Sequence, residues 1–579
     1  MDLPDDELES ATSTESGHSD GRVILLSQAA QLENPDARVI LEPREQHELL
    51  SVVANSWQGI KTSDDPRFTS KFWEMNQIAQ GWHFYQRTPD ESGMYVGRSE
   101  IIFWEDGRGQ LTEVCQEGAS FRGQSAWRRH GIAVHTMAGL SATPYTGEMF
   151  SADVSVIDPK NQTHTLAIWA FCTSSQFVQE VRKVDRALRV TNTALVKVPY
   201  DATRWLQIAH GAFPDGLPEP QTNDATQWLF HGHPAGMLAA GPASASPFGL
   251  SDPVGSSRHP SLVCRGPNLG ALLQVAVARI AGYRWPAETD STMRLDAAVR
   301  AWADRCGELA RFADDDGVVP LAPMRSEPGA DARVRELLRF ALGDAWSSAR
   351  ESTLLAEAAR ASGGKSPAAS LDDWLRNRFF EEHCALFHQR PFVWHIWDGR
   401  KKDGFGVLVH YHRLVAPNGA GRRLLEKLTH GYLGDWIKRQ RDESSSGKEG
   451  ADARLAAALA LQEKLTKILE GEPPYDLFVR WKPLHQQPIG WEPDINDGVR
   501  ISIRPFIEAD ILRVTPKIKW TKDRGSEPHR AKADFPWFWG WDERTEDFAG
   551  GSKFIGERFN DLHYTTAFKR AARERRGER

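Results

Sequence analysis

Cysteine is scarce in this chain and no Cys-x-x-Cys pair occurs among its 579 residues. The five cysteines are scattered along the sequence, at Cys115, Cys172, Cys264, Cys306 and Cys384. We therefore predict neither a disulfide framework nor a zinc ribbon. This cysteine usage fits a reducing compartment.

Long apolar runs are also missing. No basic segment followed by an apolar core opens the chain, and no run of about 18 apolar residues occurs in it. We therefore expect a protein that is neither secreted nor membrane-spanning, and that is located in the cytoplasm.

Positive charge is absent from residues 1–20, which contain seven acidic residues and no Lys or Arg. Because the whole chain has a net charge of -7, the remainder is close to neutral. A segment of this composition buries little apolar surface, and residues 1–21 are predicted to form a disordered acidic tail. The acidic balance of the whole chain therefore does not exclude a basic surface elsewhere.

The rest of the sequence predicts an α+β protein with several domains. Residues 22–210 are predicted to form a strand-rich domain, with one helix over residues 165–184. Its expected strands are Ile101–Gly109, Gly131–Met137 and Ala194–Tyr200. Residues 211–260 form a linker or an ordered excursion, residues 261–360 a helical region, and residues 361–370 a second linker.

Residues 371–579 are predicted to form a mixed α/β domain. Ser370 is expected to cap a helix, with Asp373 completing a capping box. Residues 392–414 predict a β-hairpin whose loop exposes Lys401 and Lys402, and a helix is expected from about residue 452 to residue 470. No alternation of strands and helices typical of a Rossmann methyltransferase domain is seen, so none is expected in this chain.

The segment Glu472-Pro473-Pro474-Tyr475 imitates the Asn-Pro-Pro-Tyr active site of adenine-N6 DNA methyltransferases. In that fold the motif follows a strand at the edge of a doubly wound sheet. Here Pro473 follows a helix that Gly471 is expected to end. We therefore interpret the segment as a helix terminator, and a catalytic Tyr475 is kept only as an alternative. The turn with Asp106, Gly107 and Gly109 is interpreted as a plain β-turn, not a cofactor site.

Three histidine pairs are possible metal ligands: His231 with His233, His383 with His388, and His410 with His412. His410 and His412 would share one face of a strand. No nearby carboxylate or cysteine completes a zinc site, so structural roles are favoured and no metal is expected. Residues 493–498 predict a turn in preference to a calcium loop or a nuclease motif.

Three stretches together resemble a known family: Ser56–Glu74, Leu273–Asp290 and Phe478–Phe506. They are similar to the C-terminal half of the large adenine-N6 DNA methyltransferases of BREX- and DISARM-type bacterial phage-defence systems. Those enzymes are related to type IIG restriction-modification enzymes. The resemblance covers nearly all of the sequence after about residue 21.

In that family a Rossmann-like methyltransferase domain comes first, a target recognition domain second and a C-terminal region last. The resemblance implies that residues 22–210 are the target recognition domain. It also implies that the S-adenosylmethionine site and the true Asn-Pro-Pro-Tyr motif lie on a separate catalytic chain or were lost. The expected partners are double-stranded DNA, the catalytic methyltransferase subunit and other defence-system proteins. Two alternatives are a complete methyltransferase or restriction enzyme and a protein-interaction scaffold.

Relatives usually have Gly-Ile-x-Thr-Gly-Asp-Asn at the start of the recognition domain. Gly59, Ile60, Thr62 and Asp64 match this pattern, whereas Ser63 and Asp65 depart from it. Candidate DNA-binding residues are this segment and basic side chains elsewhere, because phosphates attract Lys and Arg. They are Gly59, Lys61, Thr62, Arg67, Arg128, Arg129, Lys401, Lys402, Lys517 and Lys519. The last two lie in a basic stretch with interleaved aromatics, residues 513–541.

Overall fold

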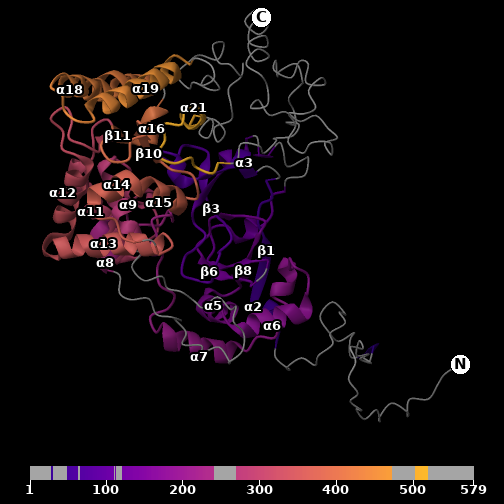
Figure 1. Cartoon of the computed structure of the whole chain (residues 1–579). Helices are drawn as coiled ribbons and strands as arrows, with labels where there is room; N and C mark the ends of the chain where they lie inside the picture. Colours follow the sequence, from indigo (N-terminus) through magenta and orange to yellow (C-terminus); the bar gives the residue numbers. More distant parts are fainter. Residues whose placement is uncertain are drawn as a thin grey trace, which may run out of the picture.

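The computed structural model describes residues 28–29, 48–62, 65–109, 111–112, 120–137, 139–239, 269–364, 366–416, 418–471 and 502–518 (Figure 1). These residues form the α+β fold that the sequence predicts, with three sheets. Within these ranges, no helix combines the length and the apolar composition needed to cross a membrane.

The first sheet has the antiparallel order β1-β8-β5-β6. Its strands are β1 (Ala54–Gln58), β5 (Gly131–His135), β6 (Ala142–Tyr145) and β8 (Val154–Pro159), and its helices are α2 (Leu50–Val53), α5 (Thr165–Cys172), α6 (Ser175–Val184) and α7 (Ala202–Ala212). Helix α5 packs on β5, β6 and β8 and also on α7, so that all of its residues are buried. A helix that is apolar all round is therefore the core of this part.

Two predictions in this part are wrong. The single helix expected over residues 165–184 is broken into α5 and α6, because the Ser174 hydroxyl accepts the backbone N–H of Phe177 and caps a new helix. The strand expected at Ala194–Tyr200 is instead a short 3₁₀-helix (Asn192–Leu195) and an irregular segment. That segment makes one isolated bridge, Leu49 with Pro199, so its β-prone residues have no full strand partner.

The second sheet has the order β2-β4-β3-β7. Its strands are β2 (Thr69–Lys71), β3 (Trp82–Gln86), β4 (Glu100–Phe103) and β7 (Met149–Phe150), and α3 (Asp65–Phe68) precedes β2. Only β3 and β7 run parallel among the strand pairs of the described residues. The strand predicted near Ile101 is confirmed as β4, and the turn at Asp106 and Gly107 follows it.

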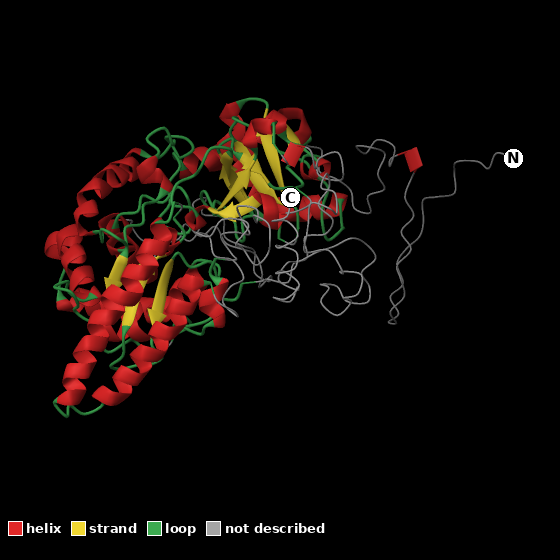
Figure 2. Ribbon diagram, turned by 90° about the horizontal axis from the view of Figure 1, so that it is seen from above, coloured by secondary structure: helices red, strands yellow, loops and turns green. Residues whose placement is uncertain are grey.

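The third sheet has three strands, in the order β10-β11-β9, and is surrounded by helices (Figure 2). Its strands are β9 (Val318–Pro320), β10 (Val393–Trp397) and β11 (Gly406–His410). The predicted hairpin is confirmed, with Val393 opposite His410 and Trp397 opposite Gly406. The remaining helices are α8 (Pro234–Ala239), α9 (Leu269–Ile280), α10 (Pro286–Thr289), α11 (Ala297–Arg305), α12 (Ala330–Leu342), α13 (Ser348–Ala361), α14 (Leu371–Asn377), α15 (Phe379–Leu386), α16 (Tyr411–Leu414), α17 (Ala420–Glu426), α18 (Leu433–Ser445), α19 (Ala451–Glu470) and α21 (Arg504–Glu508).

The predicted helix ends in this region are also confirmed. Helix α19 stops at Gly471, whose φ of 64° is the left-handed conformation that suits glycine at a C-cap. Ser370 caps α14 by accepting the N–H of Asp373. The capping box differs in one detail, because the Asp373 carboxylate accepts the N–H of Ala369 and not that of Ser370.

Trp73 joins the second sheet to the helical part of the chain. Its side chain is fully buried, and its indole N–H donates to the carbonyl of Arg390 at 2.9 Å. Its ring packs edge-on against Phe387 and is stacked with His388. The Trp73 carbonyl is 2.8 Å from Nε2 of His412. The second sheet and the helices therefore share one core.

His383 ties three elements of the helical part together. Its Nε2 accepts the N–H groups of Phe392 and Val393 at the start of β10. The proton is therefore on Nδ1, which donates to the Gln274 side chain on α9 at 3.1 Å. Burial lowers the pKa of His383 to about 3. The neutral ring is therefore the form that the fold stabilises.

Replacing Trp73 tests how strongly the shared core depends on it. We expect Trp73→Ala to lower the free energy of unfolding by about 3–5 kcal/mol, because it leaves a large cavity and removes the donor to Arg390. Leu188→Ala is the matched control, since Leu188 is 74% exposed and should change stability little. Urea unfolding followed by tryptophan fluorescence measures both. Equal stability of the two variants would contradict the assigned role.

The histidine network predicts acid sensitivity. The folded pKa of His383 lies below its unfolded value of about 6.5, so the unfolded state binds more protons between these values. The contribution of His383 to the free energy of unfolding is thus complete above about pH 6.5. It falls as the pH falls below this value, by up to roughly 1.4 kcal/mol per pH unit. His383→Gln should reduce this slope between pH 5 and 7.5 in urea unfolding. His210→Gln, at an exposed site on α7, should leave it unchanged.

Candidate nucleic-acid interface

The predicted recognition segment lies where the chain passes from the first sheet to the second. It follows β1 and leads through α3 into β2. The N–H of Ile60 donates to the Phe150 carbonyl, and the Ile60 carbonyl accepts the N–H of Ala152. Lys61 and Ser120 exchange both backbone hydrogen bonds, at 3.1 and 2.9 Å. The segment is therefore held on two sides by backbone pairing.

Gly59 is required at this crossover by close packing. A Cβ atom there would overlap the carbonyl oxygens of Phe150 and Ser151, which are backbone atoms that cannot easily move. Thr62 is buried, and its hydroxyl donates to the Asp65 carboxylate. Lys61 lies between these two fixed residues with an exposed side chain. The backbone of the segment is thus anchored while its cation faces solvent.

Aromatic side chains pack in one apolar cluster with Ile60, next to Lys61, and we call these rings and the neighbouring cations the basic–aromatic surface. It consists of Lys61, Trp104, Phe121, Arg122, Trp127 and Arg128. The Trp104 ring meets Phe121 at 4.4 Å and Trp127 at 5.6 Å, both edge-on. The three aromatics are partly buried, whereas the three cations are exposed. Such an arrangement provides charge for phosphates and apolar rings for bases.

The predicted cations Arg128 and Arg129 have different surroundings. The Arg128 side chain makes no hydrogen bond or ion pair within the described residues, and its φ of 62° is held by the bond from its N–H to the Gly147 carbonyl. Arg129 is bound to Asp158 at 2.9 Å, and Asp158 is buried. Arg128 is therefore available to a ligand, while the Arg129 charge is already balanced.

Lys401 and Lys402 lie apart from the basic–aromatic surface. They are exposed in the turn between β10 and β11, beside Asp403, which pairs with Arg454 of α19. The opposite end of β11 leads to His412, which contacts Trp73. Five residues of strand separate the two ends, or roughly 17 Å. Within the described residues, no contact joins these two lysines to the basic–aromatic surface.

The backbone of Lys517 is bound to the Gln389 side chain, next to Arg390 and the Trp73 contact. Its own side chain is exposed. The Arg67 side chain, Lys519 and Tyr475 lie outside the described residues. The interpretation of Pro473 and Pro474 as a helix terminator likewise stays a prediction, although the helix before them ends at Gly471.

Sequence reasoning missed part of the basic–aromatic surface. Arg122 donates to the Gln58 side chain at 2.8 Å and is exposed beside Phe121. Its signal was present in the sequence, because Phe121-Arg122 and Trp127-Arg128 each place an aromatic residue directly before a basic one. Trp104 had no such signal, since it follows β4 and meets Phe121 only through the fold.

A buried arginine, Arg98, connects the two four-stranded sheets. Arg98 is fully buried, pairs with Glu148 at 3.0 Å and donates to the Pro144 carbonyl at the end of β6. Its guanidinium also lies over the Trp228 ring. Burial lowers the pKa of Arg98, and the Glu148 carboxylate opposes that effect. Arg98 therefore locks the two four-stranded sheets and the segment of Trp228 together.

The histidine pairs do not form metal sites in the described part of the chain. Strand β11 ends at His410, and His412 lies in α16, so the two do not share a strand face as predicted. Their rings stack at 4.9 Å and do not converge on one point. No group of three or more His, Cys, Asp or Glu among the described residues could hold a metal ion. A separate hollow of about 570 Å³ is lined by charged residues that include Asp314, Arg333 and Lys427.

Comparison with known proteins gives one relationship. No protein-family profile matches the chain. The chain is 24% identical over 212 residues to the "Adenine-specific methyltransferase BrxX" of Escherichia coli O9:H4 (strain HS). This similarity supports a relationship to BREX-type methyltransferases. It covers 35% of this chain but 17% of that protein, so the chain matches a small part of the length of its curated relative.

Proposed function

We propose that this chain is the DNA-recognition part of a site-specific adenine-N6 DNA methyltransferase in a bacterial restriction-modification or phage-defence system. It acts with a separate catalytic chain that binds S-adenosylmethionine. The observation that carries the proposal is the crossover at Gly59–Thr62, where the segment that resembles the start of a recognition domain presents Lys61 within the basic–aromatic surface.

Three further facts support this proposal. The similarity to an adenine-specific methyltransferase connects the chain with that chemistry. The exposed cations Lys61, Arg122 and Arg128 suit a phosphate backbone, which fixes the register of a protein on a duplex. Cofactor binding is assigned to another chain because the described sheets are almost entirely antiparallel. Dinucleotide-type cofactor crevices form instead at the carboxyl ends of parallel strands.

Methylation in cells tests whether recognition and catalysis belong to separate chains. Cells that express this chain together with the catalytic chain are expected to carry N6-methyladenine at one sequence motif. Each chain alone should give none, because one lacks the reaction centre and the other lacks the contacts that choose a site. Sequencing that detects modified bases measures the outcome. Unchanged methylation without this chain would support a scaffold role instead.

Salt dependence tests the assigned DNA contacts. Replacement of two cations by Lys61→Gln and Arg128→Gln should reduce the slope of log affinity against log salt by about 1.8, since each phosphate contact contributes roughly 0.9. Lys438→Gln with Arg441→Gln removes the same charge from exposed sites on α18 and serves as the control. Fluorescence anisotropy with a labelled duplex measures both slopes. Equal slopes would show that the basic–aromatic surface does not contact DNA.

A further inference from the structure

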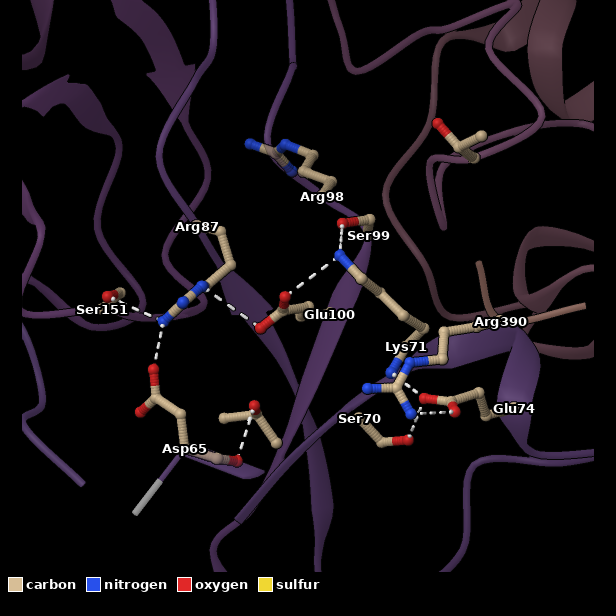
Figure 3. A network of polar contacts seen from close by, with 12 residues as sticks. Asp65, Ser70, Lys71, Glu74, Arg87, Arg98, Ser99, Glu100, Ser151 and Arg390 are labelled. Atoms are coloured by element: carbon tan, nitrogen blue, oxygen red, sulfur yellow. Dashed lines mark hydrogen bonds and ion pairs between the residues drawn. The ribbon is translucent and has the colours of Figure 1, made fainter. Parts of the chain in front are cut away.

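Arg87 lies just after β3 and joins three segments of the strand-rich part. Its guanidinium is 3.0 Å from the Asp65 carboxylate, 3.0 Å from the Ser151 hydroxyl and 3.2 Å from Glu100 (Figure 3). Its side chain is 24% exposed, so these contacts are mostly shielded from water. Three partners use the forked geometry of arginine, which a lysine could not reproduce.

The Asp65 contact connects Arg87 with the recognition segment. One Asp65 oxygen accepts from Arg87, and the other accepts from the buried Thr62 hydroxyl. The Asp65 carbonyl also accepts the hydroxyl of Thr69, which opens β2. Asp65 therefore holds the side chain of Thr62. Because Thr62 follows Lys61 directly, this contact restrains the chain where the Lys61–Ser120 pairing ends.

The Glu100 contact anchors the other side of Arg87. Glu100 also pairs with Lys71 of β2 at 3.0 Å, and Lys71 donates to Ser99 at 2.9 Å (Figure 3). Glu100 is the first residue of β4, and Asp65 is the first residue of α3, which directly precedes β2. Burial lowers the pKa of Arg87, but Glu100 and Asp65 raise it further than burial lowers it. The Arg87 guanidinium is therefore charged.

Ser151 supplies the third contact, and it belongs to the same strip of backbone as the recognition segment. Ser151 forms a parallel bridge with Ile60, and the next residue, Ala152, donates to the Ile60 carbonyl. Arg87 thus reaches the segment twice, through Asp65 beyond Thr62 and through Ser151 beside Ile60. Its side chain therefore connects the residues on both sides of Lys61.

We propose that Arg87 is the positioning residue of the recognition segment: it holds Asp65 and Ser151 so that Lys61 is presented in a fixed place to a DNA phosphate. Arg87 itself does not contact the DNA. The DNA part of this inference rests on the proposed function, whereas the ordering of the segment does not.

A double-mutant cycle tests the DNA part. Lys61→Gln should weaken duplex binding in the wild-type background but by less than about twofold in the Arg87→Met background, since the lysine is no longer in place there. The same pair made with Lys438→Gln in place of Lys61→Gln should be additive. Additive effects of Arg87→Met and Lys61→Gln would overturn the inference.

Hydrogen exchange tests the ordering of the segment without DNA. Asp65→Asn is the gentler variant, because it keeps the shape of a side chain that is 41% exposed. Both Asp65→Asn and Arg87→Met should speed exchange in a peptide covering residues 56–62 by at least about tenfold, the effect of losing one charge-assisted hydrogen bond. Unchanged exchange in both variants would overturn the inference.

Arg376→Met is the matched control for loss of a partly buried, paired arginine. Arg376 is 15% exposed and pairs with Asp372 on α14. This variant should leave exchange at residues 56–62 unchanged even if it lowers overall stability. If the wild-type chain binds no duplex DNA, the proposed function fails, and the exchange measurement still decides the role of Arg87.

Discussion

The arrangement of the two parts of the described chain depends on the burial of Trp73. A buried indole N–H needs an acceptor, and the acceptor here is the Arg390 carbonyl, far along the sequence. The Trp73 carbonyl in turn meets His412, and the ring is enclosed by Phe387 and His388. Separating the second sheet from the helices would expose this ring and leave its polar groups unpaired. Packing and hydrogen bonding at this residue therefore help to hold the two parts together.

The contacts of Trp73 also restrain the chain next to the recognition segment. Strand β2 has only three residues and ends directly before the 3₁₀-helix Phe72–Glu74 that contains Trp73. Glu74 accepts from Ser70 and the backbone of Lys71 and pairs with Arg390 at 3.5 Å. β2 thus has little freedom, and α3 precedes it directly. The backbone of Asp65 is therefore held in place by the strand that follows α3.

Local signals in the sequence predicted much of the fold. Helix α19 was predicted because its apolar spacing and its end at Gly471 depend on neighbouring residues only. The expected strand at Ala194–Tyr200 failed because a strand also needs a free partner edge, and composition carries no information about that. The break before α6 had a local signal in Ser174, which the helical periodicity on both sides masked.

The candidate site divides in the same way. Lys61 and Arg128 were candidates because charge is visible in a sequence. The hairpin turn that carries Lys401 lies instead beside α19, because Asp403 in this turn pairs with Arg454. Arg87 carried no signal at all. Its partners Asp65, Glu100 and Ser151 come from three different segments, which are brought together by the pairing of β2 with β4 and of β3 with β4 and β7. Long-range strand pairing is the information that a single sequence hides most completely.

Tryptophan, the most unusual part of the composition, serves two purposes in this structure. Three fully buried tryptophans are structural: Trp285 donates to the Ala225 carbonyl and Trp394 to the Pro391 carbonyl, as Trp73 does to the Arg390 carbonyl. Each one joins a loop to the core by packing and one hydrogen bond. Trp104 and Trp127 differ, because they are partly buried and their rings meet beside exposed cations. These three indoles therefore attach loops to the core, whereas the position of Trp104 and Trp127 suits contact with a base in the proposed function.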